Sequence, residues 1–238
     1  MSDALTISIH IQASPATIFP FLSDPQLLSQ WLGPEAIAAK GTVRESTPNA
    51  RIVFGWGYEA AVHGIAPDST IVTIELTPTA TGTTVTLTHA GLDAAQQANH
   101  RMGWTHYLSQ LAGAAASRLA AEKLPVTIEN YIHAWNEPAE TDRAARLDAC
   151  WEEDGTFRDS MGAVDGRDAL FTYIGNARQY VPGFQLELAA PPEHCHGYYR
   201  FSWLIRMPGG GIMGRGTNFG QLGSSGRIAS AVGFWDKP

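Results

Sequence analysis

The sequence TVTLTHAGLDAAQQANHRMGWTHYLSQLAGAAASRLAAEKLP, residues 84–125, changes from a strand pattern to a helix pattern. It begins within a Thr- and Val-rich segment, 83–89, which favours a β-strand. From about residue 93 to residue 122, apolar side chains recur at helical spacing and predict one long helix with a buried face. Pro125 has no amide hydrogen, so we expect it to end that helix and to mark a domain boundary.

Before this stretch, the sequence predicts more strands and two short helices. Residues 5–11 alternate between apolar and polar side chains, and Ser14-Pro15 is typical of a helix start. Further strands are expected at 51–56, 58–65 and 69–77.

After Pro125, a helical stripe begins again at Ile128 and includes Tyr131 and Trp135. Helices are then expected at about 141–151 and 167–181, and strands at 155–159, 184–190, 194–207, 211–222 and 227–235. Both halves therefore fit the α+β class with antiparallel sheets, and we expect two domains, 1–123 and 124–238.

Composition excludes several classes of partner. The chain has 238 residues, 44% of them hydrophobic, and a formal net charge of −7 without a Lys/Arg cluster. We therefore expect no nucleic acid and no membrane as a partner. The N-terminus has no secretory signal pattern, and Cys150 and Cys195 form no CxxC motif, so we expect a cytoplasmic protein with free thiols.

The first half resembles SRPBCC or START-like domains, in the branch of the activators of heat-shock-protein ATPase. The resemblance rests on IHIQASPATIF (9–19), SDPQLLSQW (23–31), STIVTIELTP (69–78), TVTLTHAGL (84–92) and GWT (103–105). It implies a helix-grip fold, a curved antiparallel sheet around a long C-terminal helix, often with an apolar cavity. The segment between Trp31 and Val53 is shorter than in this family, which implies a smaller sheet and an opened or lost cavity.

The second half is similar to SnoaL-like and nuclear-transport-factor-2-like domains, which include polyketide cyclases and ketosteroid isomerase. The matching segments are YIHAWN (131–136), WEEDGTFRD (151–159), GRDAL (166–170) and the C-terminal stretch from Gly226 to Asp236. The resemblance implies a cone-shaped α+β barrel, with three helices on a curved sheet around a pocket.

Compared with the isomerase motifs, Tyr131 matches an oxyanion-hole tyrosine, Asp159 matches the carboxylate base, and Asn218 stands where that family has a neutral aspartic acid. Such a site removes a proton beside a carbonyl group while two donors hold the enolate oxygen. Each residue also has a structural reading. Tyr131 could be a core side chain, Asp159 could cap a turn before Ser160, and the match of Asn218 depends on counting back from Gly226.

We expect the second domain to bind a small, largely apolar molecule and to be capable of cofactor-free proton transfer, either isomerisation or cyclisation. The alternative is a non-enzymatic module that binds a ligand or a protein partner. Candidate ligand-binding residues are Trp135, Trp151 and Tyr173 in the second half and Trp31 and Trp56 in the first, all of which could equally be core or rim.

No metal site or cofactor is expected, because His194 and His196, which should share a strand face, have no apparent third ligand. The strand at 198–207 places Tyr199, Phe201, Trp203, Ile205 and Met207 on one face. If the opposite face of that sheet is also apolar it needs cover, so we expect a homodimer.

Overall fold

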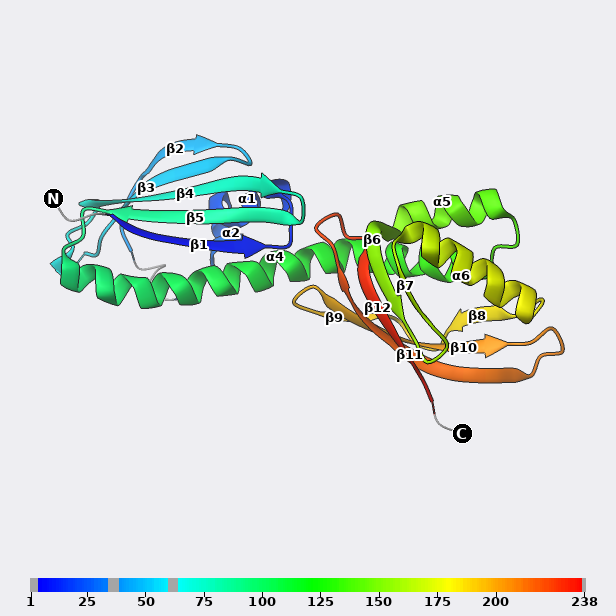
Figure 1. Ribbon diagram of the computed structural model, residues 1–238. Coiled ribbons are helices and arrows are strands. Elements are labelled where there is room, and N and C mark those ends of the chain that lie inside the picture. The colour runs from blue at the N-terminus through cyan, green and yellow to red at the C-terminus, as the bar shows by residue number, and fades with distance from the viewer. Residues whose placement is uncertain (1–3, 34–38, 60–63, 237–238) are drawn as a thin grey trace. The chain divides into compact units, whose positions relative to one another are not determined.

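The computed structural model describes residues 4–33, 39–59 and 64–236, and the chain divides into two compact units, Met1–Arg118 and Leu119–Pro238 (Figure 1). The fold is mixed α+β with one sheet in each unit, as predicted. The N-terminal unit contains β1 (Leu5–Ile11), α1 (Pro15–Ser23), α2 (Pro25–Leu28), β2 (Val43–Thr47), β3 (Arg51–Trp56), β4 (Thr70–Thr79), β5 (Gly82–Ala90) and the first part of α4 (Ala94–Asn136).

The N-terminal sheet is antiparallel, in the order β1-β5-β4-β3-β2, and α4 lies along it (Figure 1). Alternation along β4 and β5 buries every second side chain, including Val72, Ile74 and Leu87. These pack into one core with Leu108 and Leu111 of α4. The helix-grip arrangement therefore follows from a period of two in the strands and a helical period in α4.

The segment between Trp31 and Val53 keeps a strand that the sequence pattern did not predict. β2 pairs with β3, and Asn49 makes the turn between them with a φ of 61°. The strand expected at 58–65 is not formed at Tyr58 or Ile65, and residues 60–63 lie outside the described part of the chain.

Helix α4 does not end at Pro125, and this part of the prediction was wrong. The helix runs from Ala94 to Asn136 through Pro125, and it is shared by the two units. Pro125 is exposed, so water can satisfy the Ala121 carbonyl that loses its amide partner. Leu124 and Ile128 are buried in the C-terminal core, so packing stabilises the helix on both sides of the proline.

The C-terminal unit contains the rest of α4, α5 (Glu140–Cys150), β6 (Trp151–Arg158), β7 (Ala163–Asp165), α6 (Arg167–Tyr180), β8 (Gln185–Leu188), β9 (Glu193–Cys195), β10 (Tyr198–Arg206), β11 (Ile212–Leu222) and β12 (Ile228–Trp235). Its open sheet has the order β7-β6-β12-β11-β10-β8, with β9 paired to β10. β6 and β12 are parallel, which corrects the expectation of a fully antiparallel sheet. The long connection through α6 and the hairpins allows this crossover.

The inner face of the sheet carries the aromatic stripe that the sequence predicted. Tyr199, Phe201, Trp203 and Ile205 alternate along β10 and are all buried. They pack with Tyr131 of α4 and Ile174 of α6 in one core. This packing places the end of α4, helix α6 and the sheet around a common space, where the candidate site lies.

We expect each half to fold alone, because each has its own hydrophobic core. Separate expression of residues 1–123 and 124–238 should give two fragments that each unfold cooperatively in urea. Failure of both fragments to show a cooperative transition would mean that the units depend on each other for stability.

Candidate functional site

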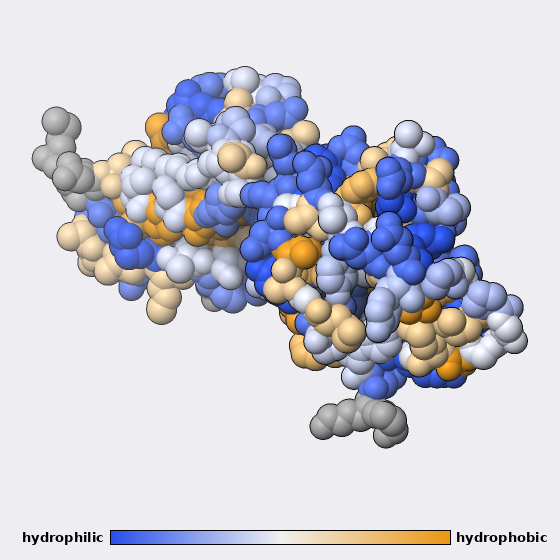
Figure 2. Space-filling view, turned by 45° about the vertical axis from the view of Figure 1, so that its right-hand side comes forward, coloured by the Kyte–Doolittle hydropathy of each residue, from blue (hydrophilic) through white to orange (hydrophobic). Residues whose placement is uncertain are grey.

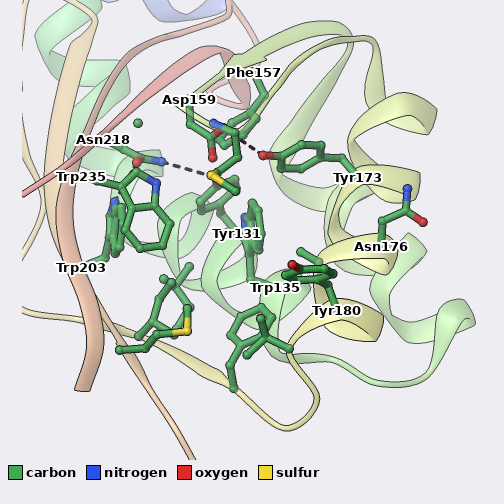
Figure 3. Close-up of a pocket in the computed structure, with 18 residues that line it drawn as sticks. Tyr131, Trp135, Phe157, Asp159, Tyr173, Asn176, Tyr180, Trp203, Asn218 and Trp235 are labelled. Atoms are coloured by element: carbon green, nitrogen blue, oxygen red, sulfur yellow. Dashed lines mark hydrogen bonds between the residues drawn. The ribbon is translucent and has the colours of Figure 1, made fainter. Parts of the chain in front are cut away.

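The C-terminal unit encloses a cavity of about 560 Å³ (Figure 3). Eight of its eighteen lining residues are aromatic, namely Tyr131, Trp135, Phe157, Tyr173, Tyr180, Phe184, Trp203 and Trp235. Asp159 and Asn218 also line it, so the three residues that the sequence singled out surround one space. A cavity of this size, with apolar walls and a few polar groups, is typical of small-molecule sites.

A chain of hydrogen bonds sets the direction of the Tyr131 hydroxyl. The Trp203 indole N–H donates to Asn218 Oδ1 at 2.8 Å, which fixes the orientation of the amide. Asn218 Nδ2 therefore faces Tyr131 and donates to its hydroxyl oxygen at 3.3 Å. Since that oxygen accepts from Asn218, the Tyr131 proton remains available as a donor. Burial raises the pKa of Tyr131 well above its ordinary value, so the hydroxyl stays protonated.

Asp159 follows β6 and is held by a short turn. Its Oδ1 accepts from the Met161 amide at 2.8 Å, the Gly162 amide at 2.9 Å and the Tyr173 hydroxyl at 2.9 Å. Burial raises the pKa of Tyr173, and donation to Asp159 raises it further. Figure 3 shows the Asp159 carboxyl group between Asn218 and Tyr173. Asp159 thus caps a turn and lines the cavity at the same time.

Comparisons with known proteins match the two halves separately. Residues 33–116 match the family model described as activator of Hsp90 ATPase homolog 1-like (AHSA1) protein. An AHSA1-like protein from Rhizobium etli is 31% identical, over 47% of this chain and 81% of that chain, with a TM-score of 0.40. A SnoaL-like family protein from Agrobacterium tumefaciens is 31% identical, over 49% of this chain and 99% of that chain, with a TM-score of 0.46.

By sequence, the N-terminal half belongs to the AHSA1-like proteins and the C-terminal half to the SnoaL-like family. An NTF2-like protein from Exiguobacterium, 15% identical over 47% of this chain and 99% of that chain, has a TM-score of 0.40. No curated protein matches the chain. No helix in the described ranges is long and apolar enough to cross a membrane.

In the SnoaL-like half, the other predicted ligand-binding residues separate into two groups. Trp135 and Tyr173 line the cavity. Trp151 is fully buried outside the lining and stacks behind Tyr131, with ring centroids 5.8 Å apart. Its role is therefore to support the tyrosine rather than to touch a ligand.

The two tryptophans predicted in the AHSA1-like half are core side chains. Trp31 is buried and donates its indole N–H to the Phe21 carbonyl at 2.8 Å. Trp56 packs against Trp104, with ring centroids 4.9 Å apart. Neither contributes to the cavity of the SnoaL-like half.

Metal ligation finds no support in the described residues, which contain no group of three His, Cys, Asp or Glu side chains able to hold an ion. His194 and His196 do not share a strand face as expected. His194 lies in β9, whereas His196 has a φ of 49° in the turn before Tyr198. The strand expected at 194–207 is interrupted there, so the two histidines do not alternate along one strand.

Sequence reasoning missed Gly233 as a site residue. Gly233 on β12 pairs with Asn218 on β11. A Cβ at this glycine would lie 3.1 Å from Asn218 Oδ1 and 3.3 Å from Asp159 Cβ. The absence of a side chain therefore keeps open the space between these two polar residues. Only the register of β11 against β12 reveals this.

Proposed function

We propose that the SnoaL-like half binds a small, largely apolar molecule in the 560 Å³ cavity and holds one of its oxygens through the Tyr131 hydroxyl. The observation that carries this proposal is the chain from Trp203 through Asn218 to Tyr131, which leaves the tyrosine proton for a ligand. A carbonyl oxygen is the natural partner, because it accepts and cannot donate. Aromatic walls supply the affinity for the apolar body.

The test compares 2-acetylnaphthalene with 2-ethylnaphthalene, which has a similar shape but no carbonyl. Tyr131→Phe should weaken binding of the ketone about tenfold and leave the hydrocarbon unchanged, because one hydrogen bond is lost. Tyr198→Phe, on the opposite face of the sheet, is the matched control and should change neither affinity. Tryptophan fluorescence titration measures both. Equal loss for the two ligands would reject the role of the hydroxyl.

A second candidate function is cofactor-free proton transfer, with Asp159 as the base. It is favoured by Asp159 Oδ2, which receives no hydrogen bond from any described residue while Oδ1 is held by three donors. The carboxylate is thus oriented but keeps one oxygen free for a proton beside the carbonyl. The Tyr131 hydroxyl would stabilise the enolate oxygen that forms.

Proton transfer can be followed with the same ketone. In D₂O, the wild-type protein should speed exchange of the methyl protons beside the carbonyl, as seen by proton NMR. Asp159→Asn should abolish that exchange and leave binding within about twofold, because the amide cannot take the proton. Binding without exchange in the wild type would favour the non-enzymatic alternative.

We also propose that the SnoaL-like half forms a homodimer through the outer face of its sheet. Tyr198, Phe219 and Phe234 are 45%, 48% and 61% exposed on that face, and the rings of Tyr198 and Phe219 are stacked. Figure 2 shows hydrophobic residues reaching the surface of this unit. Aromatic side chains on a sheet face are stabilised when a second copy covers them.

Light scattering should therefore give about twice the chain mass of 25.7 kDa. Phe234→Lys should shift the protein towards monomer, because a charge would be buried in the interface. The control is Val43→Lys, at an exposed position of the AHSA1-like half, which should leave the mass unchanged. A wild-type mass of one chain would reject the dimer.

The free thiols of Cys150 and Cys195 support the proposed cytoplasmic location.

A further inference from the structure

The only formal charge among the described residues that line the cavity is negative. Among the eighteen residues that line it, Asp159 is the one carboxylate, and no Lys, Arg or His side chain is present. The polar groups that accompany Asp159 are neutral amides and tyrosine hydroxyls, such as Asn176, Asn218 and Tyr180. A ligand entering this space therefore meets a carboxylate without meeting a cation.

The carboxylate of Asp159 is held but not neutralised. All three groups that donate to Oδ1 are uncharged, two backbone amides and the Tyr173 hydroxyl. No basic side chain within the described ranges forms an ion pair with it. Neutral donors orient a carboxylate, but they do not cancel its negative charge. A positive charge within about 4 Å of it would be attracted strongly, because the cavity walls exclude part of the water.

Two arginines approach the walls from outside and are already engaged. Arg158 points to the other side of its strand, where it pairs with Asp165 and donates to the Val164 carbonyl. Arg178 donates to the Trp135 carbonyl at 2.7 Å and lies over the Phe184 ring, 5.5 Å from its centroid. Phe184 and Asp159 line the cavity, whereas Arg178 is not among its lining residues.

Aromatic rings complete the surroundings that an organic cation prefers. Phe157 and Trp135 both contact Tyr173, the tyrosine that donates to Asp159, with ring centroids 5.4 and 6.1 Å away. Across the cavity, Trp203 and Trp235 form an edge-on pair (Figure 3). Rings that surround a cation attract it through their π-electrons, and a nearby carboxylate adds to this attraction.

We infer that the ligand of this cavity carries a positive charge, as a small organic ammonium group held between Asp159 and the aromatic rings. The inference rests on the proposed binding function and specifies its ligand class. In this reading Asp159 is the counter-ion of the ligand, which is a different role from that of a base. Anionic ligands, such as carboxylates and sulfonates, are excluded by the same charge.

Three probes of one shape test the sign of the charge. They share a phenol ring and carry a para substituent with a tetrahedral centre that is positive, neutral or negative, namely (4-hydroxyphenyl)trimethylammonium, 4-tert-butylphenol and 4-hydroxybenzenesulfonate. Isothermal titration calorimetry on the full chain should rank them in that order, with the cation at least tenfold tighter than the neutral probe. The anion should bind weakest.

The Asp159→Asn variant tests whether the negative charge of this residue attracts the ammonium probe. The amide keeps an oxygen for the Met161 and Gly162 amides, so the turn can remain, but the charge is gone. Affinity for the ammonium probe should fall to that for the neutral phenol, and the affinity for the neutral phenol should stay within about twofold. Asp154→Asn is the control, because it removes the same charge from an exposed position on β6.

The outcomes separate the two proposals. If the neutral probe binds the wild type as tightly as the cation does, the charge inference is overturned and the binding function stands. If none of the probes binds, and the naphthalene ligands also fail, the binding function itself is rejected. If Asp159→Asn does not fold, the ranking of the three probes on the wild type still decides the inference.

Discussion

Lowering the pH from 7 to 4 is expected to cost the N-terminal unit about 3 kcal/mol of unfolding free energy through one residue, the fully buried His89. Burial, together with a smaller contribution from the neighbouring His100 ring 5.1 Å away, lowers the pKa of His89 from 6.5 to about 3. Below pH 6.5, His89 binds a proton in the unfolded chain but stays neutral in the folded chain. Stability is therefore complete above that pH and declines towards pH 3.

Hydrogen bonds explain why the folded protein holds His89 neutral. The Trp104 indole N–H donates to His89 Nδ1 at 3.1 Å, so this nitrogen carries no hydrogen. Nε2 must then carry the proton and donate to Thr70 Oγ1 at 2.8 Å. Thr70 in turn donates to the Trp56 carbonyl at 2.9 Å. Protonation of Nδ1 would break the bond to Trp104 and place a charge in the core.

The measurement is hydrogen exchange of β4 and β5 amides in the full chain at pH 7 and pH 4, corrected for the intrinsic exchange rates. His89→Gln keeps a donor and an acceptor but cannot titrate, so its loss of stability between the two pH values should be smaller by about 3 kcal/mol. His106→Gln, at an exposed position of α4, should behave as the wild type does. An unchanged pH dependence in His89→Gln would contradict the prediction.

Periodic segments of this chain could be predicted closely because their information is local. The apolar spacing at 167–181 predicts a helix, and α6 forms over Arg167–Tyr180. The alternation along β10 likewise predicts its buried side. The prediction that a helix ends at Pro125 was wrong because the effect of this proline is not local. Its cost to a helix depends on whether water reaches the carbonyl one turn before it, and that is a property of the folded surface.

The candidate site was predictable in part for the same physical reason. Tyr131 belongs to a helical stripe, and Asp159 stands beside a recognisable strand. The bond from Trp203 to Asn218 and the gap at Gly233 instead join three strands, whose register is set by long-range pairing. A shift of one residue in the pairing of any of these strands would turn its residues to the opposite face of the sheet, so no local pattern contains this information.

Gly233→Val is expected to weaken binding of 2-acetylnaphthalene at least tenfold, because it fills the gap between Asn218 and Asp159. Even a Cβ at this position lies 3.1 Å from Asn218 Oδ1, and the two methyl groups of valine would have to displace the amide. Displacement also removes the donor that orients Tyr131, so the ketone should lose both space and its hydrogen bond. Gly233→Ala should give a smaller loss in the same direction.

The control is Gly209→Ala, in the loop between β10 and β11, where an added Cβ meets no atom within 4 Å. This variant should bind the ketone as the wild type does. Thermal unfolding should show that Gly233→Val remains folded, with a cost of about 1–3 kcal/mol for the crowded side chain. If the folded Gly233→Val protein binds the ketone with wild-type affinity, the ligand does not occupy the space between Asn218 and Asp159, and the proposed site is wrong.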